Sequence, residues 1–151
     1  MSTVAFAAIL LAMVTWVGAL IFLSFLMAPT AFSVLDQKDA SRFVRAIFPR
    51  YYGLGVGCGV FALLGLIGLG GVSSAWTGPL LLEIAIIVVM TCLTIYSLTL
   101  VPKINAARDA GEAQDDRFKR LHKRSVVLNA IVLFLGLGAL VIMAHSMMRL
   151  V

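Results

Sequence analysis

Three polar side chains lie at helical spacing where a basic stretch of the chain meets a long apolar one. His122, Ser125 and Asn129 occupy positions i, i+3 and i+7, so one face of a helix carries all three. An imidazole, a hydroxyl and an amide together offer donors and acceptors to a small molecule. The alternative is a structural role, because interhelical hydrogen bonds in membranes contribute about 0.6 to 2 kcal/mol.

Two more polar residues are expected at the same depth. Asn105 follows the third apolar run of the chain, and Tyr51 precedes the second. If the apolar runs cross a membrane, both residues approach the first three at the cytoplasmic side. We therefore predict a ligand-binding cluster of Tyr51, Asn105, His122, Ser125 and Asn129.

One acidic residue falls inside an apolar run. Glu83 heads a helical stripe that continues through Ile87, Met90, Thr94 and Ser97. A carboxylate embedded in a membrane is a candidate functional group. Glu83 also stands about one turn after the expected helix start, where the helix dipole favours an acid. A structural role at that helix end is therefore the alternative.

The residues that could hold a metal or cofactor are few. Cys58 and Cys92 lie inside apolar runs and have neither CxxC nor His-paired spacing, so we interpret them as buried thiols. With the dispersed methionines they leave soft-metal handling as an alternative. No buried His pair suggests haem, and no Ser/His/Asp order, metal signature or phosphate loop occurs. We expect no cofactor and favour a non-enzymatic protein, with a membrane enzyme that uses His122 as acid or base as a further alternative.

The composition indicates a membrane protein. Hydrophobic residues make up 62% of the chain and charged residues 13%, with a mean hydropathy of +1.06. A soluble domain carries about 25% charged residues. Each apolar run is long enough to cross about 30 Å of hydrocarbon as a helix. We predict an all-α bundle of four transmembrane helices in one domain over 1–151, with spans of about 4–27, 53–70, 79–101 and 125–147.

Prolines and an amphipathic pattern predict where the first two spans end and begin. Pro29 is expected to end the first span, because proline removes a backbone donor. Residues 36–52 carry apolar and basic faces at helical spacing, which predicts an amphipathic helix in the cytoplasmic interface. Asp36 or Asp39 would cap this helix, and Pro49 would limit it.

Glycines follow at the start of the second span. Positions 53, 55, 57 and 59 form two overlapping GxxxG patterns. Small residues at that spacing let helices approach closely in lipid. We expect this packing within the monomer, and the alternative is a seam between copies in a homo-oligomer.

The basic residues predict the orientation. The segment 29–50 holds four Lys/Arg and the segment 102–124 holds seven, so eleven of the twelve lie on one side. By the positive-inside rule both segments are cytoplasmic loops and both termini are outside. Because the charges flank apolar spans, we expect anionic lipid headgroups as partners and no nucleic acid.

Several motifs resemble one family of membrane proteins. The first half contains GALIFLSF at 18–25 and FPRYY at 48–52; the second contains Pro102, Asn105 and FKRLHKRSVVLN at 118–129. With these motifs, the chain resembles the bacterial branch of the transmembrane protein 205-like family over nearly its whole length. That family comprises small four-helix membrane proteins of unknown function. The resemblance implies a bacterial inner (plasma) membrane protein with the same fold and polar cluster. It also implies a sulfur-ligand role for Cys58, because eukaryotic relatives are associated with platinum-drug resistance.

Two functions follow from these patterns. The first is an integral membrane protein that binds a small molecule or soft metal ion, or helps to move it, through the polar cluster. The second is a structural or accessory protein whose basic loops engage anionic lipid or a partner protein.

Overall fold

Long helices make up the described part of the chain. The computed structural model describes residues 3–73 and 76–148, and the elements within these ranges are helical, with no strand. The first helix has three consecutive segments, α1 (Thr3–Ile21), the π-helical η1 (Phe22–Met27) and α2 (Ala28–Val34). The other elements are α3 (Gln37–Ser73), α4 (Gly78–Asp109), the 3-10 turn η2 (Gly111–Gln114) and α5 (Asp115–Met148).

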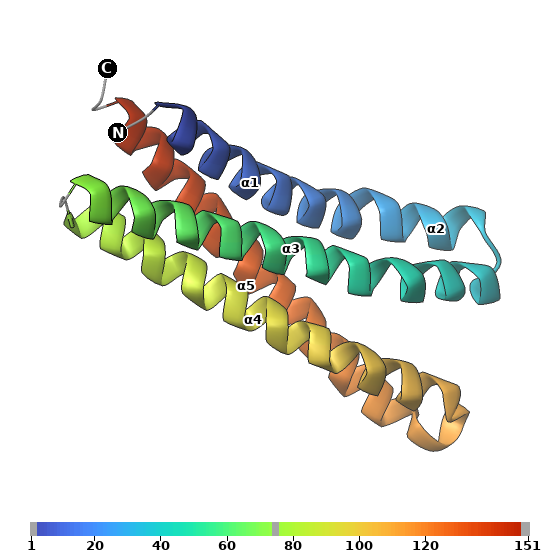
Figure 1. The fold of residues 1–151 in the computed structure, drawn as a ribbon. Coiled ribbons are helices and arrows are strands. Elements are labelled where there is room, and N and C mark those ends of the chain that lie inside the picture. The colour runs from blue at the N-terminus through green and yellow to red at the C-terminus, as the bar shows by residue number, and fades with distance from the viewer. Residues whose placement is uncertain (1–2, 74–75, 149–151) are drawn as a thin grey trace.

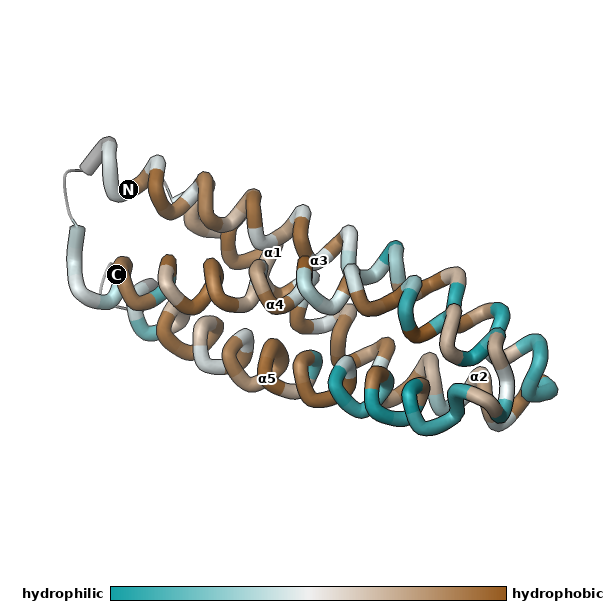
Figure 2. Tube along the Cα trace, turned by 90° about the horizontal axis from the view of Figure 1, so that it is seen from below, coloured by the Kyte–Doolittle hydropathy of each residue, from teal (hydrophilic) through white to brown (hydrophobic). Residues whose placement is uncertain are grey.

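Four of these helices are long and apolar enough to cross a membrane. They are Thr3–Val34, Gln37–Gly71, Gly78–Asp109 and Gly111–Ser146. This confirms the predicted all-α membrane protein with four spans. The helices are most apolar towards one end of the bundle, and α3, α4 and α5 continue into the other end as polar helix (Figure 2).

The helices run antiparallel along the chain and form a bundle (Figure 1). The start of α1, the end of α3, the start of α4 and the end of α5 lie at one end, and the α2–α3 and α4–α5 turns lie at the other. Hydrophilic residues gather at this second end, which we call the polar end (Figure 2). The two basic segments therefore come together. The assignment of the polar end to the cytoplasm and of both termini to the outside stays a prediction from charge.

The prolines do not end the helices, so that expectation is wrong. Pro49 and Pro102 lie inside α3 and α4, and Pro29 stands at the start of α2, directly after the π-helical η1. Because α1, η1 and α2 form one continuous helix, Pro29 is an internal proline, and local π-helical adjustments such as η1 are one way in which a membrane helix accommodates the missing N–H. An internal proline costs about 3 kcal/mol. Pro49 has no N–H to donate to the carbonyl of Arg45, and the neighbouring Arg50 side chain donates to the carbonyl of Ala46.

The predicted interfacial helix is not a separate element. Residues 37–52 are the first part of α3, which continues without a break into the second span. Most of the two predicted polar loops is likewise helical, with short breaks around 35–36 and 110–114. The predicted cap is confirmed, because Asp36 Oδ1 accepts hydrogen bonds from the N–H groups of Lys38 and Asp39 at 3.0 and 2.8 Å. A capped, uninterrupted α3 holds its polar half in register with its apolar half.

Trp16 fixes the approach of α1 to α3. Its side chain is completely buried, and a Cβ added to Gly55 or Gly59 would lie about 3 Å from carbon atoms of the indole ring. Gly53 and Gly57 face open space instead. The prediction of close glycine packing within the monomer is therefore confirmed for one of the two GxxxG patterns.

Candidate functional site

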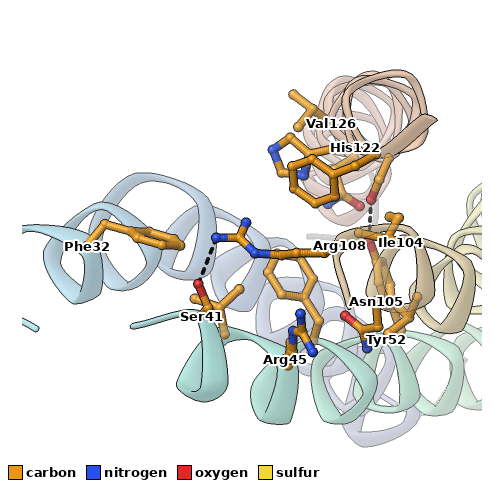
Figure 3. A pocket seen from close by; sticks show the side chains of 15 residues that line it. Phe32, Ser41, Arg45, Tyr52, Ile104, Asn105, Arg108, His122 and Val126 are labelled. Atoms are coloured by element: carbon orange, nitrogen blue, oxygen red, sulfur yellow. Dashed lines mark hydrogen bonds between the residues drawn. The ribbon is translucent and has the colours of Figure 1, made fainter. Parts of the chain in front are cut away.

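A pocket of about 130 Å³ lies at the polar end, where α2, α3, α4 and α5 meet (Figure 3). Its surface is mostly apolar, and a few polar side chains reach into it. The continuous helices explain this arrangement, because α3, α4 and α5 project side chains at three- and four-residue spacing beyond the spanning segments. The lining residues are Phe32, Ser41, Val44, Arg45, Phe48, Tyr52, Val101, Ile104, Asn105, Arg108, Phe118, His122, Ser125, Val126 and Asn129.

Four of the five residues in the predicted cluster line this pocket. They are Asn105 on α4 and His122, Ser125 and Asn129 on α5. Tyr51 does not line it; the side chain of Tyr51 is buried, and its hydroxyl has no hydrogen-bond partner among the described residues. The neighbouring Tyr52 lines the pocket instead. Successive residues of a helix point about 100° apart, and in α3 it is Tyr52 that is turned towards the pocket.

Tyr52 forms the inner end of the pocket with Ser125. The two hydroxyl oxygens are 3.0 Å apart and both side chains are buried, so this hydrogen bond joins α3 to α5. Asn129 and Ser97 lie close to the same Tyr52 hydroxyl. Hydrogen bonds of this kind hold helices together in a membrane, where water does not compete for the donors.

Arg108 enters the pocket from α4 and is the main residue that the sequence patterns did not single out. Its side chain extends across the pocket towards α3, where Nη2 donates to Ser41 Oγ at 2.9 Å (Figure 3). The guanidinium carbon lies 5.1 Å from the centre of the Phe118 ring, a distance typical of a cation–π contact. The spacing of Asn105 and Arg108, three residues apart on one helix, is the signal that would have revealed it.

His122 and Phe118 form the side of the pocket contributed by α5. Their rings stack with centroids 5.7 Å apart and an angle of 10° between the planes. His122 precedes the apolar run that forms the fourth span. Partial desolvation of its ring, together with the Arg108 guanidinium, lowers the pKa of His122. The imidazole is therefore neutral at pH 7 and offers one donor and one acceptor.

Arg45 contributes a second positive charge, but this charge is paired. Arg45 Nη1 and Asp109 Oδ1 are 2.6 Å apart, which links α3 to the end of α4. The two side chains are 32% and 62% exposed, so the pair contributes at most about 1 kcal/mol to stability. The Nε of Arg45 is buried and has no hydrogen-bond partner among the described residues.

The remaining predicted site residues lie apart from the pocket. Glu83 is near the start of α4, at the end of the bundle opposite the pocket; its side chain is buried, and Oε1 has no hydrogen-bond partner among the described residues. The stripe that Glu83 heads is part of the buried face of α4. Cys58 is half-buried and Cys92 exposed. In the described ranges, no three His, Cys, Asp or Glu residues gather as metal ligands would.

Comparison with known proteins gives a family and a relative. Residues 11–113 match the family described as a domain of unknown function (DUF4149). A protein of Aquifex aeolicus (strain VF5), described as uncharacterized, is 29% identical over 122 residues, which cover 81% of this chain and 83% of the relative. No solved structure matches the chain. The family match includes Tyr52, Asn105 and Arg108 and ends before the pocket residues of α5.

Proposed function

Since the chain belongs to the DUF4149 family, whose description names no activity, we propose a function from the pocket: an integral membrane protein that binds a small molecule at the polar end of its four-helix bundle. One observation carries this proposal. The pocket has a mostly apolar lining with a few convergent polar groups, as is typical of small-molecule sites.

The size of the pocket limits what it holds. Its volume of about 130 Å³ is close to the roughly 150 Å³ of an apolar cavity that admits benzene. A single ring or a short chain fills that space. A longer ligand would extend through the open side of the pocket.

The pocket is a better candidate site than Cys58, because a soft metal ion needs several sulfur or nitrogen ligands. Cys58 is a single half-buried thiol outside the pocket lining. We include the resemblance to the transmembrane protein 205-like family in this proposal. Because the function of that family is unknown, the resemblance does not assign a reaction to the protein. Because the protein is a membrane protein, we extend the proposal to movement of the bound molecule.

Two neighbouring valines allow a matched test. Val126 and Val127 on α5 are 52% and 49% exposed, but only Val126 lines the pocket. Val126→Trp should fill the pocket, whereas Val127→Trp adds the same ring outside it. In native mass spectrometry of the full chain purified from its own membranes, the wild type and Val127→Trp should carry an additional small-molecule mass that Val126→Trp lacks. Equal occupancy in both variants would refute the proposal.

A second function is favoured by the basic residues of the hydrophilic polar end (Figure 2). Lys119, Arg120 and Lys123 are exposed on α5 there. Near an anionic surface each basic residue contributes about 1 kcal/mol. An accessory protein that engages anionic lipid should therefore gain thermal stability from added phosphatidylglycerol in detergent, and salt should remove the gain. If phosphatidylglycerol and phosphatidylcholine stabilise the protein equally, this second function is excluded.

A further inference from the structure

Arg108 brings a positive charge into the pocket without a carboxylate to neutralise it. Among the described residues the ion pairs are Arg45–Asp109 and Lys119–Asp115, and neither includes Arg108. A guanidinium has five N–H donors. The Ser41 hydroxyl accepts from one of them, and the contact with Phe118 uses the face of the group. Donors therefore remain for a bound molecule.

The nearest carboxylate in sequence is engaged elsewhere. Asp109 follows Arg108 on α4, but it pairs with Arg45 of α3. Adjacent helical residues point about 100° apart, so Asp109 does not follow Arg108 into the pocket. Both arginines line the pocket, and of the two only Arg45 has a carboxylate partner among the described residues. A partly buried cation without a counter-charge is unfavourable. An anion that enters the pocket removes this penalty.

The other walls of the pocket are apolar. They are formed by Phe32, Val44, Phe48, Val101, Ile104 and Val126. An inorganic anion would leave these surfaces unfilled. Phe32 and Val126 are also 49% and 52% exposed, so the apolar wall continues to the outer surface of the bundle. A ligand with an apolar chain or ring fits both parts of the site.

We propose that the occupant is an amphipathic anion, with a carboxylate or phosphate group at Arg108 and an apolar chain or ring between α2 and α5. This inference rests on the proposed function and adds the class of ligand. The planar guanidinium suits either head group, because it can donate two parallel hydrogen bonds to it. Asn105 and the neutral His122 line the same pocket and supply further donors.

The test compares decanoate with decanol, which share a chain and differ in the charge of the head group. The full-length protein in phosphatidylcholine nanodiscs is titrated with each compound, and binding is measured by native mass spectrometry. A charge-assisted contact predicts that decanoate binds about 10-fold more tightly, or better. Equal affinities for the two compounds would overturn the inference.

Two arginine variants test which residue causes the preference for decanoate over decanol. Arg108→Gln keeps a long polar side chain without the charge and should reduce the preference for decanoate to nearly none. Arg120→Gln, at an exposed position of α5 outside the pocket lining, should keep it. An unchanged preference in Arg108→Gln would also overturn the inference.

Different outcomes of these experiments refute the ligand class and the proposed function. If both compounds bind equally and Val126→Trp abolishes both, the pocket binds small molecules and only the assignment of an anion is wrong. If neither compound binds, both proposals are wrong.

A further arm separates two sources of the anion, a membrane lipid and a free amphipathic molecule. Phosphatidylglycerol in the nanodisc should displace decanoate if a membrane lipid is the ligand. It should leave the affinity for decanoate unchanged if the ligand is a free amphipathic molecule.

Discussion

The guanidinium of Arg108 donates a hydrogen bond of 2.9 Å to the hydroxyl of Ser41, although 67 positions separate the two residues in the chain. This bond spans the pocket from α4 to α3 and holds the arginine side chain within it (Figure 3). The side chain is thereby oriented before any ligand arrives. Such preorganisation lowers the entropic cost of binding.

The hydrogen bond between Tyr52 and Ser125 should stabilise the bundle. Tyr52→Phe and Ser125→Ala each remove it and should each lower the free energy of unfolding by about 0.5 to 1.5 kcal/mol, measured by denaturant titration in detergent. The double variant should resemble either single one, because the same bond is lost. Tyr51→Phe is the control: the Tyr51 hydroxyl has no hydrogen-bond partner among the described residues, so the change should be neutral. Additive losses in the double variant would contradict the assignment.

Glycines two positions apart on α3 should respond in opposite directions to alanine. At Gly55 a methyl group meets the buried indole of Trp16, so Gly55→Ala should destabilise the protein by about 1 to 3 kcal/mol. At Gly53 nothing lies within 4 Å, so Gly53→Ala should be neutral or add up to about 1 kcal/mol through helix propensity. Thermal unfolding in detergent measures both. A stable Gly55→Ala variant would show that α1 and α3 are not packed as described.

Acid should strengthen the binding of an anion through His122. Its pKa is lowered by partial desolvation and by Arg108, so the ring is neutral at pH 7 and gains its charge as the pH falls through that pKa. The new charge lies near Arg108 in the pocket. Decyl sulfonate, which stays ionised throughout, should bind about 3- to 10-fold more tightly at a pH below the pKa of His122 than at about pH 8.

The control for this pH dependence is His122→Gln, which cannot gain a charge. Its affinity for decyl sulfonate should be nearly independent of pH over the same range. If the wild type and His122→Gln show the same profile, His122 does not face the bound anion.

The four spans follow directly from the sequence, because long apolar runs with no more than one charged residue are typical of transmembrane helices. Most of the predicted cluster also reaches the pocket. His122, Ser125 and Asn129 share a face on any helix that contains them all, and Asn105 lies at the same depth whichever way α4 turns. These positions depend only on local periodicity.

The other features of the fold and the pocket depend on contacts between helices, which the periodicity of the sequence does not encode. Pro49 is predicted to limit the interfacial helix, but α3 runs through it, and α4 runs through Pro102 in the same way. The rotation of α3 beyond Pro49 decides that Tyr52, and not Tyr51, faces the pocket. Arg108 falls in the segment 102–124 that is predicted as a loop, and only a continued helix places it on the same face as Asn105. Its uncompensated charge depends on Asp109 pairing with Arg45, a contact across 64 residues.

The most direct test of ligand binding is a high-resolution density map of the full-length protein purified from its own membranes. Binding of a small molecule predicts non-protein density in the pocket, in contact with Arg108 and enclosed by the apolar side chains of α2, α3 and α5. A map in which Arg108 pairs with a carboxylate of the chain, and side chains fill the space among those helices, would contradict it.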